Sequence, residues 1–128
     1  IMDRAKARAI SGEMHSGFAA LRVAFPVNFR RKPGKINFED DVAQNIRRIE
    51  DIWTECRADH CGSGDFLFGR FSIADAMYAP VVSRFHVYDV PVRPEARAYM
   101  ETMMATSAWR EWDEASRQEP WIIERVER

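Results

Sequence analysis

The side chains best suited to metal binding or nucleophilic chemistry lie in one short segment. Cys56 and Cys61 are five positions apart, and His60 lies between them. On a helix this spacing spreads the three side chains around the cylinder, and the four-ligand spacing of a zinc site is absent. We therefore expect two reduced cysteines without a functional role, and a metal site is the weaker alternative.

A second candidate is the basic segment 28–35, whose sequence is NFRRKPGK. Its arginines and lysines could bind an anion. Proline and glycine at positions 33 and 34, however, are typical of a solvent-exposed connection. We interpret the segment as a solvated loop, with anion binding as the weaker alternative.

The amino-acid composition of the chain limits the classes of molecule that could bind it. The chain has 128 residues, 46% of them hydrophobic, and its 19 basic residues nearly balance 20 acidic ones. A chain of this length can bury one core, so we expect a single domain over residues 1–128. The near-zero net charge argues against nucleic acid or an anionic membrane as partner, because neither would be attracted over long range.

The hydrophobic pattern also bears on localisation. No stretch approaches the roughly 20 apolar residues of a membrane-spanning helix, and residues 1–10 lack the apolar core of a secretory signal. We therefore expect a soluble, cytoplasmic protein. Because the chain begins with Ile1 and enters a helical pattern within a few residues, we also expect it to be a segment of a longer protein.

Two helices are predicted in the first half of the chain. The first covers 3–25 and ends before Pro26. Its apolar face has the three- and four-residue spacing of a helix and consists of Ile10, Met14, Phe18, Leu21 and Phe25. The second is expected to start with Asn37 as N-cap, to carry acidic residues in its first turn, and to end at the flexible segment 61–64.

Two shorter helices are predicted in the last third of the chain. One starts at Pro94, because the missing N–H of proline costs nothing in a first turn. The next is capped by Ser107 and ends before Pro120. The tail that follows is apolar, so we expect it to fold back onto the rest of the molecule. Its large apolar residues are Trp121, Ile122 and Ile123.

The segment 72–87 is the most informative part of the chain. Ser72 and Asp75 have the spacing of a capping box, in which each side chain accepts from the backbone N–H of the other residue. The apolar surface that follows is too wide for a helix with one wet side. We therefore predict an all-α bundle of about five helices with a central buried helix over 72–87, and a structural role for the two cap residues.

Five segments of the chain carry a family resemblance. They are AISGEMHSGF at 9–18, FLFGRF leading into SIAD at 66–75, AMYAPVV at 76–82, RAYM at 97–100 and EPW at 119–121. In this order they resemble the helical C-terminal domain of cytosolic glutathione S-transferases, and more narrowly a bacterial branch of that family. The resemblance spans nearly the whole chain and implies that the capped helix is the folding centre.

The resemblance implies an enzyme whose chemistry lies outside this chain. Members of the family transfer the glutathione thiolate to small electrophiles, or run related isomerase and reductase reactions. They hold glutathione in a thioredoxin-like N-terminal domain, where a serine, tyrosine or cysteine lowers the pKa of its thiol. This sequence shows no βαβ pattern. We therefore expect no catalytic residue and no cofactor here, with glutathione as a co-substrate of the full-length protein only.

The same resemblance implies one wall of a co-substrate pocket. In the family an apolar pocket for the electrophile lies along the inner face of the first helix. Met14 and Phe18 share a face there, with His15 adjacent to it and Arg22 one turn beyond. Trp121, near the C-terminus, could cover the pocket. Core packing is the competing interpretation for Met14 and Phe18, and a surface position is the competing one for His15.

The resemblance further implies a homodimer in which the first helices of two subunits pack side by side. Arg4, Arg8 and Glu13 would lie at that contact. The main alternative function is a helical protein–protein interaction module of the same fold without transferase activity, since such domains also occur in translation factors and synthetases. A third hypothesis is an unrelated helical bundle that binds a small apolar ligand.

Overall fold

The computed structural model describes residues 1–127 and is all-helical, as the sequence predicts. In these residues no β-strand forms, and the segment 66–70 contains only two isolated β-bridges. The helices are α1 (Met2–Ser16), α2 (Ala19–Ala24), α3 (Asp40–Asp59), α4 (Ile73–Val87), α5 (Pro94–Met104), α6 (Ser107–Gln118) and the short 3₁₀ helix η1 (Glu124–Val126).

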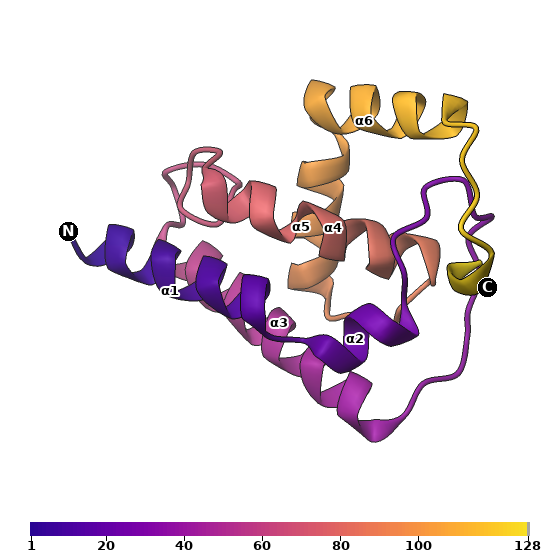
Figure 1. Cartoon of the computed structure of the whole chain (residues 1–128). Coiled ribbons are helices and arrows are strands. Elements are labelled where there is room, and N and C mark those ends of the chain that lie inside the picture. Colours follow the sequence, from indigo (N-terminus) through magenta and orange to yellow (C-terminus); the bar gives the residue numbers. More distant parts are fainter. Residues whose placement is uncertain (128) are drawn as a thin grey trace.

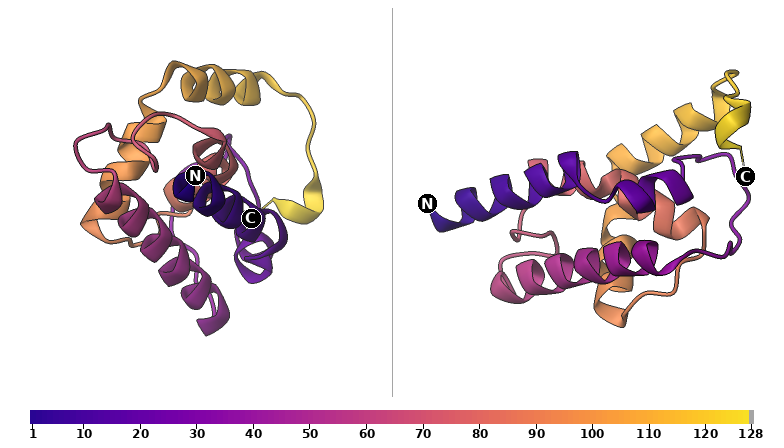
Figure 2. Two further views of the ribbon diagram at one scale, coloured as in Figure 1. Left: turned by 90° about the vertical axis from the view of Figure 1, so that its left-hand side faces the viewer. Right: turned by 60° about the horizontal axis from the view of Figure 1, so that its bottom comes forward.

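The helices are arranged around α4, which packs against both α1 and α5 (Figure 1). α3 packs against α2 and α5, and α6 contacts α5. In Figure 1 and in the left-hand view of Figure 2, α6 lies away from α2 and α3, and the C-terminal segment (yellow) descends from it toward the loop that follows α2. The two ends of the described chain are therefore held by different parts of the molecule.

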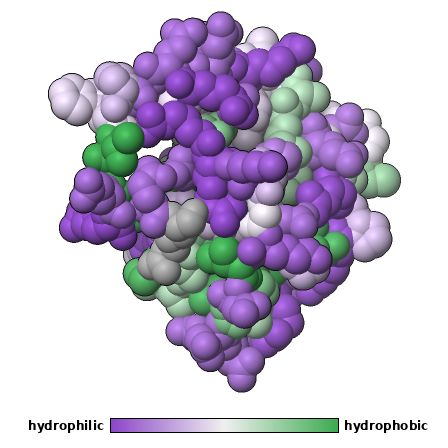
Figure 3. All heavy atoms as spheres, turned by 90° about the vertical axis from the view of Figure 1, so that its right-hand side faces the viewer, coloured by the Kyte–Doolittle hydropathy of each residue, from purple (hydrophilic) through white to green (hydrophobic). Residues whose placement is uncertain are grey.

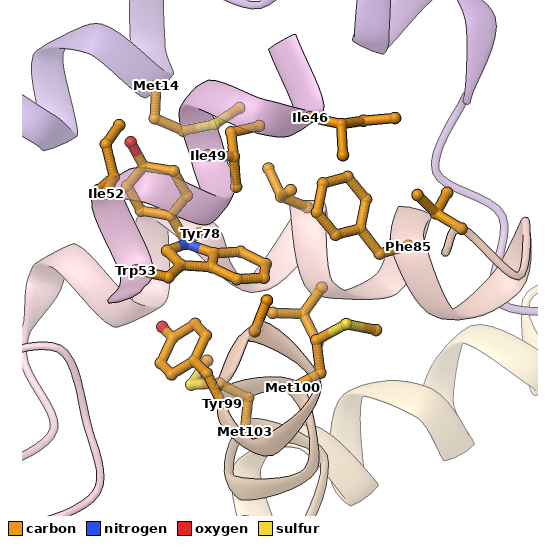
Figure 4. Close-up of a cluster of buried hydrophobic side chains, with 14 of the residues drawn as sticks. Met14, Ile46, Ile49, Ile52, Trp53, Tyr78, Phe85, Tyr99, Met100 and Met103 are labelled. Atoms are coloured by element: carbon orange, nitrogen blue, oxygen red, sulfur yellow. The ribbon is translucent and has the colours of Figure 1, made fainter. Parts of the chain in front are cut away.

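The core surrounds α4 because this helix is apolar around most of its circumference. Figure 4 shows Trp53 of α3 between the side chains of α4 and α5. Its ring centroid lies 6.1 Å from that of Tyr78, 5.5 Å from that of Phe85 and 4.8 Å from that of Tyr99. The Tyr78 hydroxyl donates to the Ile10 carbonyl at 3.0 Å, which joins α4 to α1. The predicted buried central helix is confirmed.

Asp75 organises the start of α4. Its carboxylate is fully buried, and it accepts from the backbone N–H of Ser72 at 2.9 Å and from that of Leu67 at 3.1 Å. The Tyr99 hydroxyl of α5 donates to it at 2.9 Å. The Ser72 hydroxyl also donates to the same carboxylate at 3.2 Å. The carboxylate thus satisfies donors from three segments that would otherwise be buried without partners.

The predicted first helix is wrong in one respect, because it is two helices. α1 ends at Ser16, Gly17 is extended, and Phe18 takes the left-handed conformation with φ 56° and ψ 36° before α2 begins. A Cβ atom at position 17 would lie 2.6 Å from the Glu13 carbonyl oxygen, so only glycine fits this turn. The apolar spacing continues across the break and therefore hides it.

Two predicted N-caps are also wrong. Glu39, and not Asn37, is the N-cap of α3. Phe38, the residue before it, packs edge-on against Phe25, with ring centroids 5.6 Å apart. Thr106, and not Ser107, caps α6, and its Oγ1 accepts from the backbone N–H of Trp109 at 3.2 Å. In both cases the sequence pattern places the helix start only to within one or two residues.

Candidate functional site

The cysteine and histidine segment forms a structural contact between α1 and the end of α3. Cys56 is fully buried, Cys61 is exposed, and both are free thiols. Burial raises the pKa of the Cys56 thiol to about 11, so it carries little thiolate near neutral pH. His60 contacts the Cys56 carbonyl through Nδ1 at 2.7 Å and Asp3 through Nε2 at 3.2 Å. Within residues 1–127 no group of three or more potential ligands is placed to hold a metal ion.

The predicted co-substrate residues of the first helix are split between core and surface. Met14 is 5% exposed and Phe18 is 8% exposed, and both belong to the hydrophobic core. Figure 4 shows Met14 above Ile49, on the inner side of α1. His15 is exposed, and its carbonyl accepts from Arg22 Nη1 at 3.3 Å across the α1–α2 break. These four side chains therefore do not form one open wall in this chain.

The end of α4 carries a half-buried arginine that contacts the end of α2. Arg84 donates through Nε to the Phe25 carbonyl at 2.8 Å. Burial, together with the nearby positive charge of Arg22, lowers its pKa to about 10. The guanidinium still carries its charge near neutral pH. It ties the end of α2 to α4.

A cavity of about 410 Å³ lies where the loop after α2, helix α6 and the C-terminal segment meet. We call it the C-terminal cavity. The centroids of the Phe29 and Trp112 rings are 4.3 Å apart, and these two rings form an aromatic wall of the site. Trp121, predicted from the sequence to cover a pocket, also lines the cavity. The lining residues are Val27, Asn28, Phe29, Arg30, Trp112, Ala115, Ser116, Glu119, Trp121, Ile123, Val126 and Glu127.

Two polar side chains of the loop hold the C-terminal segment over this cavity. Arg30 donates through Nη1 to the Glu119 carbonyl at 2.7 Å and through Nη2 to the Trp121 carbonyl at 2.6 Å. Asn28 Nδ2 donates to Glu127 Oε2 at 2.8 Å. The tail therefore returns to the rest of the molecule through hydrogen bonds to its backbone and to one carboxylate.

The tail folds back as predicted, but its large apolar side chains stay exposed. Trp121 is 77% exposed, Ile122 is 64% exposed and Ile123 is 56% exposed. Arg30 binds backbone carbonyls of the tail and leaves its large side chains mostly in solvent, although Trp121 and Ile123 also line the cavity. Figure 3 shows the face of the molecule that carries this region, where green hydrophobic residues lie among purple hydrophilic ones.

The sequence interpretation missed Phe29, Arg30 and Trp112 as site residues. The segment 28–35 was interpreted as a solvated loop, although Phe29 is 8% exposed. An aromatic residue inside a basic loop was the available signal, since a large apolar side chain seldom stays in water without a partner. No pattern in the sequence pairs Phe29 with Trp112, which are far apart in the chain.

The cavity is suited to binding. Its walls present aromatic rings, a methyl-rich surface from Val27 and Val126, and the side chains of Arg30 and Glu119. Flat apolar molecules bind in concave aromatic sites of this kind, with a few polar groups to orient them. The Ser116 hydroxyl on its wall donates to the Trp112 carbonyl at 2.7 Å.

Comparison with protein families decides the class of the molecule. A family model described as the glutathione S-transferase C-terminal domain matches residues 28–115. The chain belongs to this family. The match begins in the loop that lines the C-terminal cavity and extends through α3, α4 and α5 into α6. No curated protein and no solved structure matches the chain significantly.

Family membership indicates the general role of this glutathione S-transferase-like domain. Such domains supply a co-substrate or dimerisation surface beside a glutathione-binding domain. The match is to the family as a whole and does not distinguish its branches. Within residues 1–127 none of the helices is both long and apolar enough to cross a bilayer.

Proposed function

We propose that residues 1–128 form the co-substrate-binding and dimerising domain of a cytoplasmic glutathione S-transferase that detoxifies small electrophiles. The observation that carries the proposal is the aromatic C-terminal cavity, which the two ends of the family match, at the loop 28–30 and in α6, form together with the tail that follows. The full-length protein would transfer the glutathione thiolate to the electrophile. Glutathione and the group that activates it would belong to a thioredoxin-like N-terminal domain, so the chain by itself is inactive.

The C-terminal cavity selects a flat apolar electrophile. Phe29 and Trp112 offer ring faces, and Trp121 closes the site from the tail. Of the five residues that the sequence predicts for co-substrate contact, Trp121 is the one that lines this cavity. His15 and Arg22 lie at the α1–α2 junction and are candidates for ligand contact only once a second domain covers that surface.

The direct test is titration of the chain with a small chloronitroarene by isothermal calorimetry. We expect saturable binding that Trp121→Ala weakens by about tenfold, since burying an aromatic ring against a ligand contributes about 1.4 kcal/mol or more. Ile122→Ala is the matched control, because Ile122 is an exposed apolar residue of the same tail and does not line the cavity.

Two outcomes would contradict the proposal. Equal weakening by Trp121→Ala and Ile122→Ala would show non-specific adsorption to the apolar tail. Micromolar affinity of the chain for glutathione would show that the glutathione site is not in another domain. We expect no tight glutathione binding in the same calorimeter.

The dimer proposal rests on the outer face of α1. Arg4 and Arg8 are exposed, as a partner contact requires. Glu13 instead pairs with Arg48 of its own chain, with contacts of 2.7 Å and 2.9 Å. We therefore propose that Arg4 and Arg8 contact a second subunit and that Glu13 positions α1 against α3. Sedimentation of the Arg4→Glu, Arg8→Glu double variant should show a weaker dimer than that of the parent chain.

A further inference from the structure

A second cavity lies on the other side of Phe29 and Arg30 from the C-terminal cavity. It has a volume of about 330 Å³ and is formed by the loop 29–33, the C-terminal half of α4 and helix α6. We call it the basic cavity. Its lining residues are Phe29, Arg30, Arg31, Lys32, Pro33, Ser83, His86, Val87, Trp109, Asp113 and Arg117.

The basic cavity carries an excess of positive charge. Asp113 is the one acidic residue among its lining residues, and it forms an ion pair with Arg117 of the same helix at 3.1 Å. Arg30 donates to carbonyl oxygens, which carry no net charge, and Lys32 is exposed. Neither residue has a carboxylate partner in the part of the chain that the structure describes. An anion in the cavity would therefore meet two uncompensated cations.

An unpartnered hydroxyl lies on the wall of the same cavity. Ser83 is 1% exposed, and its Oγ has no hydrogen-bond partner in residues 1–127. Buried hydroxyls are nearly always hydrogen-bonded, because an unmade bond is costly. A ligand oxygen in the cavity would supply the missing acceptor. The hydroxyl is thus a second observation, independent of the charges, that points to a ligand.

Aromatic side chains form the rest of the wall. Phe29 and Trp109 both line the cavity, and their ring centroids are 5.4 Å apart. Each is at most 9% exposed, so their positions are fixed by packing. A ligand that combines an anionic group with a small ring would match the charge, the hydroxyl and the aromatic surface together.

We propose that the basic cavity binds a small aromatic phosphate monoester, with its phosphate held by Arg30, Lys32 and the Ser83 hydroxyl and its ring against Phe29 and Trp109. Phosphate suits this donor set because its several oxygens accept from guanidinium, ammonium and hydroxyl groups at once. The site goes beyond the co-substrate role proposed for the C-terminal cavity. It needs no residue of another domain.

Calorimetric titration of the chain at low salt tests this site, with phenyl phosphate and inorganic phosphate as the two probes. We expect saturable binding of phenyl phosphate and weaker binding of inorganic phosphate, which cannot use the aromatic wall. Lys32→Gln and Ser83→Ala should each weaken phenyl phosphate about tenfold, the usual loss for one hydrogen bond to a charged group. Both variants should fold, because Lys32 is exposed and the Ser83 hydroxyl has no partner to lose.

Lys35→Gln is the matched control. It removes the same charge from the same loop, and Lys35 lines a different cavity. We expect its affinity to stay within about twofold of the parent chain, since one distant surface charge is screened by solvent. Equal effects of Lys32→Gln and Lys35→Gln would overturn the proposal in favour of diffuse attraction.

Two further outcomes would also overturn it. The first is an absence of saturable phenyl phosphate binding, or equal affinity for inorganic phosphate, which would remove the aromatic part of the site. The second concerns location, read from amide chemical shifts during the titration. Shifts centred on Ser83 and Lys32 support the basic cavity, and shifts centred on Trp121 would place the ligand in the C-terminal cavity instead.

Discussion

Asp75 and Arg30 organise two regions of the molecule by similar chemistry and with opposite consequences. Asp75 is fully buried and accepts from two backbone N–H groups and one tyrosine hydroxyl. Arg30 is exposed and donates to two backbone carbonyls of the tail. Water can replace the partners of Arg30 but not those of Asp75. Loss of the Arg30 side chain should therefore loosen only the tail, whereas loss of the Asp75 carboxylate should destabilise the whole fold.

Asp75→Ala is expected to have the largest effect. It leaves the Leu67 and Ser72 N–H groups and the Tyr99 hydroxyl without their acceptor, and each buried orphan donor costs about 1–3 kcal/mol. The free energy of unfolding should fall by about 3 kcal/mol or more, which is a large part of the stability of a typical domain. Urea denaturation measures this loss.

Asp113→Ala is the control for that measurement. Its ion pair with Arg117 lies on the surface of α6, so the loss should stay below about 0.5 kcal/mol. If urea denaturation gives Asp75→Ala and Asp113→Ala the same free energy of unfolding, the Asp75 carboxylate does not stabilise the fold as described.

Tyr99→Phe measures how much one of the hydrogen bonds to the Asp75 carboxylate contributes to the free energy of unfolding. The carboxylate keeps its two backbone donors and loses only the tyrosine hydroxyl, so unfolding should require about 1–2 kcal/mol less free energy. Burial raises the pKa of Tyr99 well above its usual value. The hydroxyl therefore stays protonated, and the loss should be the same at pH 6 and at pH 9. A loss that disappears at pH 9 would contradict this assignment.

Arg30→Ala should free the tail and leave the core intact, because the Arg30 side chain donates to the backbone of the tail. We expect trypsin to cleave after Arg125 several times faster, while the free energy of unfolding changes by less than about 1 kcal/mol. Mass spectrometry of the digest gives the cleavage rate. Lys35→Ala, on the same loop and without a contact to the tail, should leave that rate unchanged. Global destabilisation by Arg30→Ala would mean that the two regions are not distinct.

The smallest expected effect concerns His60. Its hydrogen bond to the Cys56 carbonyl, helped by Asp3, raises the pKa of its imidazole above the usual value of about 6.5. Since the folded pKa is raised, the added stability is fully present below pH 6.5 and is lost as the pH rises through the folded pKa. The Asp3 side chain is 70% exposed, so the effect should be small.

The His60 effect is measured as the difference in Tm between pH 5.5 and pH 8. His60→Gln should reduce this difference relative to the parent chain, and His86→Gln, which changes an exposed histidine, should not. The same Tm difference in the parent chain and in His60→Gln would show that the contact with Asp3 does not stabilise the fold.

The sequence predicted the elements well where the signal was local. The apolar spacing of 73–87, the first-turn proline at Pro94 and the pair Ser72 and Asp75 all lie within a few residues, so their interactions depend little on the rest of the chain. The break at Gly17 and the two N-caps were missed. The apolar spacing continues across the break and hides it, and at both N-caps the local pattern allowed more than one helix start.

The site was predicted less well than the fold for the same reason. Met14 and Phe18 have the spacing of a helix face, but spacing cannot tell a core face from a ligand face. Trp121 was placed near a pocket, yet its partner Phe29 comes from a loop that was interpreted as solvated. A cavity made of three separated segments has no pattern of its own in the sequence.

An all-helical domain could be predicted from the chain alone, because helical periodicity and end-capping are properties of neighbouring residues, and the order of its motifs pointed to the glutathione S-transferase C-terminal family. Which donors meet Asp75, which rings face Phe29, and that Arg30 and Ser83 border a cavity became known only from the folded structure. These features join residues far apart along the chain. Their geometry exists only after the helices have packed, when burial fixes which polar groups have partners and which do not.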